Sequence, residues 1–71
     1  MSDVKDHDSE LPEVATPADV ARYLNVAPGT LANDRSRGRG PAFVKVGNRV
    51  RYLRSDVLDY LAANRTTPAS A

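Results

Sequence analysis

The stretch that decides the fold runs from Gly38 to Arg54 and reads GRGPAFVKVGNRVRYLR. Two β-prone runs, Phe43–Val46 and Arg49–Leu53, lie on either side of the dipeptide Gly47-Asn48. Gly and Asn tolerate the positive φ angles on which a short turn between antiparallel strands depends. The stretch therefore predicts a β-hairpin with its turn at Gly47-Asn48.

A two-residue turn also sets the register of this hairpin, with Val46 opposite Arg49. Successive side chains of a strand point to opposite faces, and a slip of one residue would exchange the two faces. We assign one face, with Lys45 at its edge, to the core and place Arg49 and Arg51 on the other. The predicted core face carries Phe43, Val50 and Tyr52.

Charge is distributed unevenly along the chain. Residues 1–15 carry five acidic side chains and one basic one, a net charge of −4, whereas residues 16–71 carry a net charge of +5. Within residues 35–54 there are seven basic side chains and no acidic one. Such a block is typical of a protein that binds a polyanion, whereas arginines kept only for solubility are usually interspersed with acids.

The size and composition exclude several classes of protein. A chain of 71 residues forms one small domain at most, with an expected stability on the order of 3–5 kcal/mol. The absence of cysteine excludes disulfides and thiolate metal sites. The sequence has neither a membrane-spanning run nor a signal-peptide core, so we expect a cytoplasmic protein with no membrane partner.

A first helix is predicted over Pro17–Leu24. Thr16 can cap it, Pro17 fits its first position, and Asp19 lies where the acid of a capping box would lie. Val20, Tyr23 and Leu24 form an apolar stripe that we assign to the core. Asn25, which tolerates the left-handed conformation, ends the helix.

A second helix is predicted over Pro28–Arg37, with a poor N-cap at Ala27 and a stop at Gly38. Leu31 is its one large apolar residue, so the other faces should point outward. The turn over residues 25–27 joins the two helices into a helix-turn-helix. Its inner angle should be filled by Ala21, Leu24, Val26 and Leu31.

A third helix is predicted over Asp56–Ala63, with Ser55 as its N-cap and Val57, Leu58 and Leu61 packing back on the first helix. The predicted fold is α+β and mainly α, a winged helix-turn-helix with a two-stranded β-hairpin wing between the second and third helices. We expect residues 1–14 to be a disordered acidic leader, residues 15–64 the DNA-binding domain and residues 65–71 a flexible tail.

Three runs carry a family resemblance: TPADVARYLNVAPGTL from Thr16 to Leu31, RSRGRGPAFVKVGNRVRY from Arg35 to Tyr52, and RSDVLDYL from Arg54 to Leu61. Together they resemble the MerR-type winged helix-turn-helix domains of the excisionase and AlpA-like group, over about residues 15–64. Many relatives carry an aromatic residue where this chain has Asp34.

The resemblance implies a small DNA-binding protein of phages and mobile elements. Such proteins bind attachment-site DNA, often cooperatively and with bending of the DNA, and direct an integrase towards excision. The implied partners are double-stranded DNA, an integrase and further copies of the chain. Other relatives act as transcription regulators.

We expect the second helix to enter a major groove. Thr30 and Asn33 are candidates for base edges, and Arg35 and Arg37 for guanine or phosphate. The amides at Pro28, Gly29 and Thr30 suit a phosphate, and the wing should lie over the minor groove or its phosphates. The remaining DNA-binding candidates are Arg39, Lys45, Asn48, Arg49 and Arg51. Each has a simpler alternative: Thr30 as a helix-start hydroxyl, for example, or Arg54 paired with Asp56.

No enzyme is predicted, because the folded part has no Cys, no His and no paired-carboxylate or Gly-rich phosphate motif. We expect no cofactor and no metal. Two alternatives to an excisionase remain, namely an AlpA/MerR-like transcription regulator and a protein-interaction adaptor whose basic face meets an acidic partner. One hypothesis for the acidic leader is that it competes with DNA for the arginines.

Overall fold

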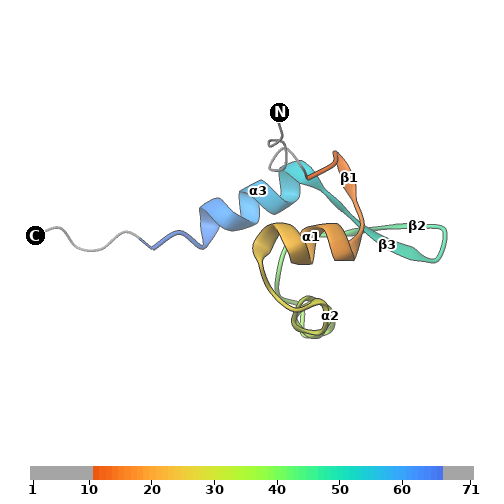
Figure 1. Ribbon diagram of the computed structural model, residues 1–71, viewed down its shortest axis with the longest axis horizontal. Coiled ribbons are helices and arrows are strands. Elements are labelled where there is room, and N and C mark those ends of the chain that lie inside the picture. Colours follow the sequence, from red (N-terminus) through yellow and green to blue (C-terminus); the bar gives the residue numbers. More distant parts are fainter. Residues whose placement is uncertain (1–10, 67–71) are drawn as a thin grey trace, which may run out of the picture.

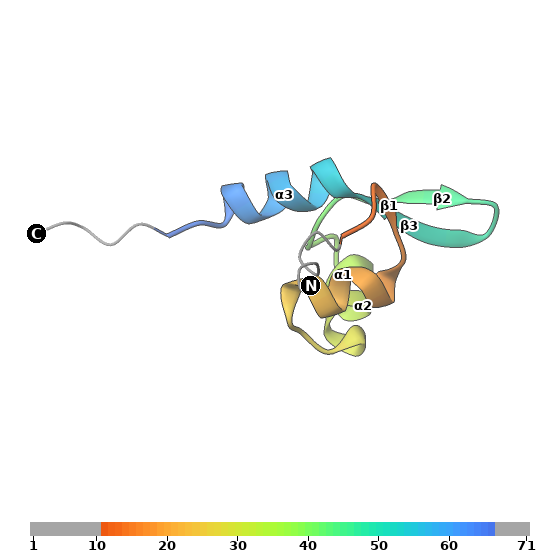
Figure 2. The ribbon, with the colours of Figure 1, turned by 45° about the horizontal axis from the view of Figure 1, so that its top comes forward.

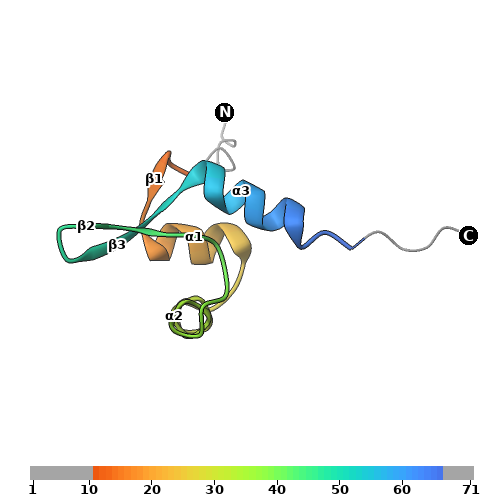
Figure 3. The ribbon, with the colours of Figure 1, turned by 180° about the vertical axis from the view of Figure 1, so that it is seen from behind.

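The computed structural model describes residues 11–66, in which three helices and a three-stranded antiparallel sheet form a small, mainly helical α+β domain, consistent with a winged helix-turn-helix (Figure 1). The elements are β1 (Val14–Ala15), α1 (Pro17–Leu24), α2 (Pro28–Ser36), β2 (Val44–Val46), β3 (Arg49–Leu53) and α3 (Arg54–Ala63). The hairpin β2–β3 and helix α3 extend in opposite directions from the middle of the molecule, in front and back views alike (Figures 1 and 3).

Helix α1 has the ends that its sequence predicts. The Thr16 hydroxyl accepts a hydrogen bond from the Asp19 amide at 3.0 Å, and the Asp19 carboxylate accepts one from the Thr16 amide at 3.1 Å. Two amides that would otherwise lack partners at the helix start are thereby satisfied. Asn25 follows the helix with a left-handed φ of 61°, so both predicted boundaries are confirmed.

Helix α2 ends one residue earlier than predicted, because Arg37 has left the helical conformation and caps it with a φ of −97°. Gly38 follows with a φ of 74°, a value that favours glycine. At the other end, Ala27 provides no side-chain cap, as expected. Leu31 is buried and is the residue through which α2 enters the core, as predicted.

The hairpin has the predicted register, with Val44 opposite Arg51, Lys45 opposite Val50 and Val46 opposite Arg49. Of the two turn residues, only Gly47 has a positive φ, at 64°. A positive φ at the first central position alone is the pattern of a type II′ turn, whose twist suits a hairpin. Asn48 therefore does not need the left-handed conformation that the sequence suggested for it.

Strand β1 is a feature that the sequence analysis missed. It pairs with β3 on the edge away from β2, with Val14 opposite Leu53 and Ala15 opposite Tyr52. Leu11, just before it, is only 1% exposed. Leu11 and Val14 were assigned to the acidic leader, yet Leu11 lies in the core and Val14 pairs with Leu53 in the sheet. The rest of that leader, residues 1–10, and the end of the predicted tail, residues 67–71, lie outside the described residues.

Helix α3 begins at Arg54, before the predicted start, and the prediction of Ser55 as its N-cap was wrong. The cap position is Leu53, which makes no side-chain capping bond and is also the last residue of β3. The first amide of the helix, that of Arg54, instead donates to the carbonyl oxygen of Glu13 at 2.9 Å. The residue before β1 therefore supplies an acceptor that a capping side chain would otherwise provide.

The core is small and takes few residues from each element. Its buried side chains are Leu11, Ala15, Val20, Ala21, Leu31, Tyr52 and Val57, with Leu24 and Val50 packed against it. Several residues predicted to be inside lie substantially exposed instead: Tyr23 at 39%, Phe43 at 40%, Val26, Leu58 and Leu61. Because α3 leads away from the body, only Val57 near its start is buried (Figure 1).

Candidate nucleic-acid interface

The helix-turn-helix is formed by α1, the turn at residues 25–27, and α2. Helix α2 packs on α1, and the Val26 amide donates to the Ala21 carbonyl oxygen at 2.9 Å, which closes the turn. Ala21 and Leu31 are both buried between the helices. Seen along the shortest axis of the molecule, α2 is viewed end-on below α1, on the side away from β1 and α3 (Figure 1).

The outer face of α2 is polar and open to solvent. Pro28, Gly29, Thr30 and Asn33 are all exposed. Hydroxyl and amide side chains can donate to and accept from base edges, and an Asn can form a bidentate pair with adenine. The structure thus leaves both predicted base-contacting residues, Thr30 and Asn33, accessible.

The first turn of α2 offers fewer amides than the sequence suggested. Pro28 has no N–H, and the Thr30 amide donates to the Ala27 carbonyl oxygen at 3.0 Å. Within residues 11–66 the Gly29 amide has no acceptor and remains the donor with which a phosphate could pair.

The loop after α2 is folded onto the end of that helix. The Arg37 amide donates to the carbonyl oxygens of Asn33 and Asp34, and the Arg39 amide donates to that of Asp34 at 2.7 Å. Arg37 and Arg39 are exposed. Two guanidinium groups are thus carried by an ordered loop at the negative end of the α2 dipole, where cations are favoured.

The β2–β3 hairpin, or wing, projects beyond the helices (Figure 2). Lys45, Asn48 and Arg49 are exposed on it. Arg51 is half-buried, and its Nη1 donates to the Val50 carbonyl oxygen at 2.7 Å. The register places Lys45 on the face of buried Tyr52, as predicted, and both arginines on the other.

Arg35 has side-chain partners from the wing. Its Nη1 donates to the Tyr52 hydroxyl at 3.0 Å, and its guanidinium carbon lies 5.8 Å from the centroid of the Phe43 ring. Its side chain is half-buried. These contacts join residues far apart in the chain, so local sequence patterns do not predict them.

Arg54 also has an internal partner. Its Nη1 donates to the Leu11 carbonyl oxygen at 3.1 Å, and it does not form the ion pair with Asp56 that was its simpler alternative. This contact was not predicted, because Leu11 lay in a segment expected to be disordered.

No carboxylate within residues 11–66 neutralises the basic block. The single ion pair in this part of the chain joins Arg22 and Asp19 at 3.0 Å, on α1. The same residues contain no cluster of His, Asp or Glu able to hold a metal ion. Nor do they contain a helix with the length and apolar character needed to cross a membrane.

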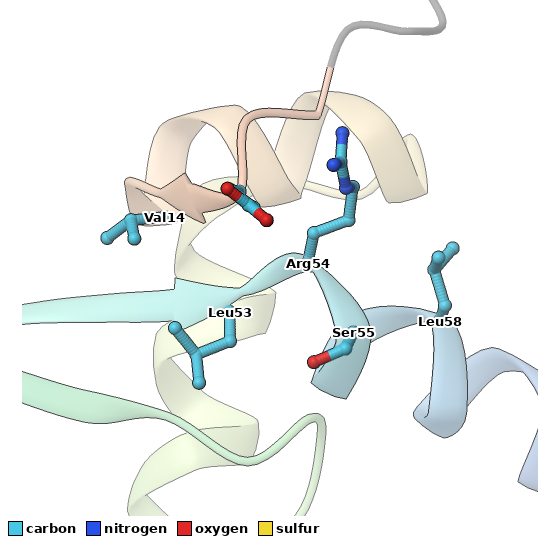
Figure 4. A pocket seen from close by; sticks show the side chains of 6 residues that line it. Val14, Leu53, Arg54, Ser55 and Leu58 are labelled. Atoms are coloured by element: carbon cyan, nitrogen blue, oxygen red, sulfur yellow. The ribbon is translucent and has the colours of Figure 1, made fainter.

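A pocket of about 390 Å³ lies where β1, β3 and the start of α3 meet (Figure 4). In Figure 4 the Arg54 side chain extends towards the segment before β1, whereas Leu53 points the opposite way. The residues that line the pocket are Glu13, Val14, Leu53, Arg54, Ser55 and Leu58. Its surface is mostly apolar, none of it comes from α2, and the wing contributes only Leu53, the last residue of β3.

Comparison with known proteins agrees with this geometry. The profile of a family described as "Helix-turn-helix domain" matches residues 16–65, which include both helices of the motif, the wing and α3. None of the curated proteins compared with the chain is similar enough to count as a relative. The chain therefore belongs to the helix-turn-helix domain family, which is typical of DNA-binding proteins.

Proposed function

We propose that the chain is a sequence-specific double-stranded DNA-binding protein that acts as an excisionase, directing an integrase of a phage or mobile element towards excision. The observation that carries the DNA-binding part is the pairing of an exposed, polar α2 with a basic loop and wing whose charges have no carboxylate partners within residues 11–66. The resemblance of residues 15–64 to the excisionase and AlpA-like group supports the finer assignment.

In this proposal α2 enters a major groove with its first turns. Thr30 and Asn33 contact base edges, and the Gly29 amide binds a phosphate beside them. This division suits their positions, because recognition helices contact bases chiefly through their N-terminal residues.

The basic side chains hold the domain on the DNA backbone. Phosphate contacts fix orientation and register, whereas base contacts provide specificity. The proposed phosphate or minor-groove ligands are Arg37, Arg39, Asn48, Arg49 and Arg51, and Lys45 adds general electrostatic attraction. Among these Arg49 is the exposed wing arginine, so we assign it the principal wing contact.

One copy of such a small domain should bind only moderately, since single modules bury roughly 600–1,000 Å² on DNA. We therefore propose that several copies bind side by side, or that an integrase contributes. A transcription regulator would share the DNA-binding surface but would act at a promoter without a recombinase.

Fluorescence anisotropy with a mixed-sequence duplex over a salt series tests the DNA-binding part. Each phosphate contact contributes about −0.9 to the slope of log K against log salt concentration. Arg65→Ala is a matched control, because it removes one positive charge just beyond α3, remote from α2 and the wing (Figure 1). Arg65→Ala should leave the slope nearly unchanged, whereas Arg49→Ala should make it shallower.

A recombination assay with a cognate integrase tests the excisionase part. The proposal predicts that the protein raises excision and lowers integration. A promoter response with no effect on recombination would favour the regulator. Absence of duplex binding even at low salt, together with capture of an acidic protein surface, would favour the adaptor.

A further inference from the structure

Arg35, Tyr52 and Phe43 form a cluster, here called the helix–wing link. Arg35 is the last residue but one of α2, and Tyr52 lies in β3 with no exposed surface. Phe43 immediately precedes β2, and its ring lies 6.3 Å from that of Tyr52 at an interplanar angle of 60°. The cluster therefore joins the C-terminal end of α2 to both sides of the wing.

The Arg35–Tyr52 bond is the only hydrogen bond within residues 11–66 that joins side chains of two different elements. The other bond between two side chains, Arg22–Asp19, lies within α1. Helix α2 is otherwise held mainly on α1, through Leu31. Between α2 and β2 the chain passes through Gly38 and Gly40, both at positive φ. The hydrogen bond thus adds a direct restraint on the angle between α2 and the wing, which the loop otherwise sets from one end alone.

The chemistry of the link suits arginine. Its planar guanidinium can donate to a hydroxyl at its edge while its face lies over an aromatic ring, an arrangement that the ammonium of lysine cannot reproduce. Partial burial strengthens both contacts, because less water competes for the donor.

We propose that Arg35 is a positioning residue that sets α2 and the wing at the separation needed for both to engage DNA, and that it is not itself a phosphate ligand. This inference rests on the proposed function, since it concerns how the two DNA-contacting elements act together. It replaces the expectation that Arg35 reads guanine or grips the backbone. Without the link, each element could still touch DNA, but their simultaneous binding would cost ordering entropy.

The test compares Tyr52→Phe, Arg35→Lys and the double variant with the wild-type chain, by anisotropy over a salt series. Tyr52→Phe deletes only the hydroxyl and keeps the buried ring, and circular dichroism checks that each variant is folded. We expect each single variant to lose affinity about fivefold or more, with an unchanged salt slope. The double variant should be no weaker than Arg35→Lys, because both changes break one contact.

The control is Arg49→Gln, which should lower the steepness of the salt dependence by about 0.9. Wild-type affinity in both Tyr52→Phe and Arg35→Lys would overturn the inference. A further variant, Arg35→Gln, removes the charge as well as the hydrogen bond. If Arg35→Gln reduced the steepness of the salt dependence by about 0.9 while Tyr52→Phe kept wild-type affinity, the inference would also be overturned, because Arg35 would then be a phosphate ligand. Failure of the wild-type chain to bind duplex would instead overturn the proposed function, so the two failures are distinguishable.

Discussion

The guanidinium of Arg54 donates a hydrogen bond at 3.1 Å to the carbonyl oxygen of Leu11, 43 residues earlier in the chain. The backbone amide of the same residue donates to the carbonyl oxygen of Glu13. Arg54 thus holds the segment before β1 against the start of α3, and Leu11 fills the core beside it. The last arginine of the basic block thus has a structural partner, and a residue expected in a disordered leader is one of the most buried of residues 11–66.

Leu11→Ala should therefore unfold much of the protein. Removing a buried leucine costs about 2–5 kcal/mol, which is comparable with the whole stability expected for so small a domain. Urea denaturation followed by circular dichroism measures this loss. Val14→Ala is the control, because Val14 is 54% exposed and should change stability by less than about 0.5 kcal/mol. Equal effects of the two variants would contradict the burial of Leu11.

The hypothesis that the acidic leader competes with DNA needs a deletion that spares Leu11. Removing residues 1–13 would destabilise the domain and confuse the result, whereas removing residues 1–10 takes away four acids and one lysine and keeps the core. The shorter deletion should tighten binding to duplex DNA at low salt, with a smaller gain at high salt because screening weakens the competition. Unchanged or weaker binding at low salt would dispose of the hypothesis.

The two faces of the wing should differ in their effect on DNA binding. Lys45 lies on the Tyr52 face and Arg49 on the opposite one, and both are exposed. Lys45→Gln and Arg49→Gln remove the same charge, so a comparison of their salt slopes separates direct phosphate contact from general attraction. We expect a reduction of about 0.9 for Arg49→Gln and a smaller one for Lys45→Gln. The reverse order would mean that the wing presents its Tyr52 face to DNA.

Thr16→Ala should destabilise the helix-turn-helix by about 1 kcal/mol, because the Thr16 hydroxyl satisfies the Asp19 amide at the start of α1. Thermal unfolding measures the change, and Thr16→Ser, which keeps the hydroxyl, is the control. A loss of stability as large in Thr16→Ser would show that the methyl group, rather than the cap, matters at this position.

The sequence predicted best those features that depend on neighbouring residues. The capping box of α1, the left-handed Asn25 and the register set by Gly47-Asn48 each follow from residues a few positions apart. Strand β1 was missed because it is only two residues long and its partners, Leu53 and Tyr52, are distant in the sequence. Local preferences give no signal for such a strand.

The positions of aromatic and apolar residues were harder to predict, because periodicity says which residues share a face but not how far the core extends. Tyr23 and Phe43 flank buried positions and remain partly exposed. The link between Arg35 and Tyr52 had no sequence signal either, since it depends on how α2 is set against β3. Exposure of Thr30, Asn33 and Arg49 is compatible with the roles proposed for them.

The most direct test of the account is the salt dependence of duplex binding by the wild-type chain beside a variant with Arg49 and Arg51 both changed to Ala. The basic loop and wing should give the wild-type chain a slope of about −3 to −5, and the folded variant should bind more weakly with a shallower slope. Identical affinity and slope for the two proteins, with the fold retained, would contradict the claim that the wing binds DNA.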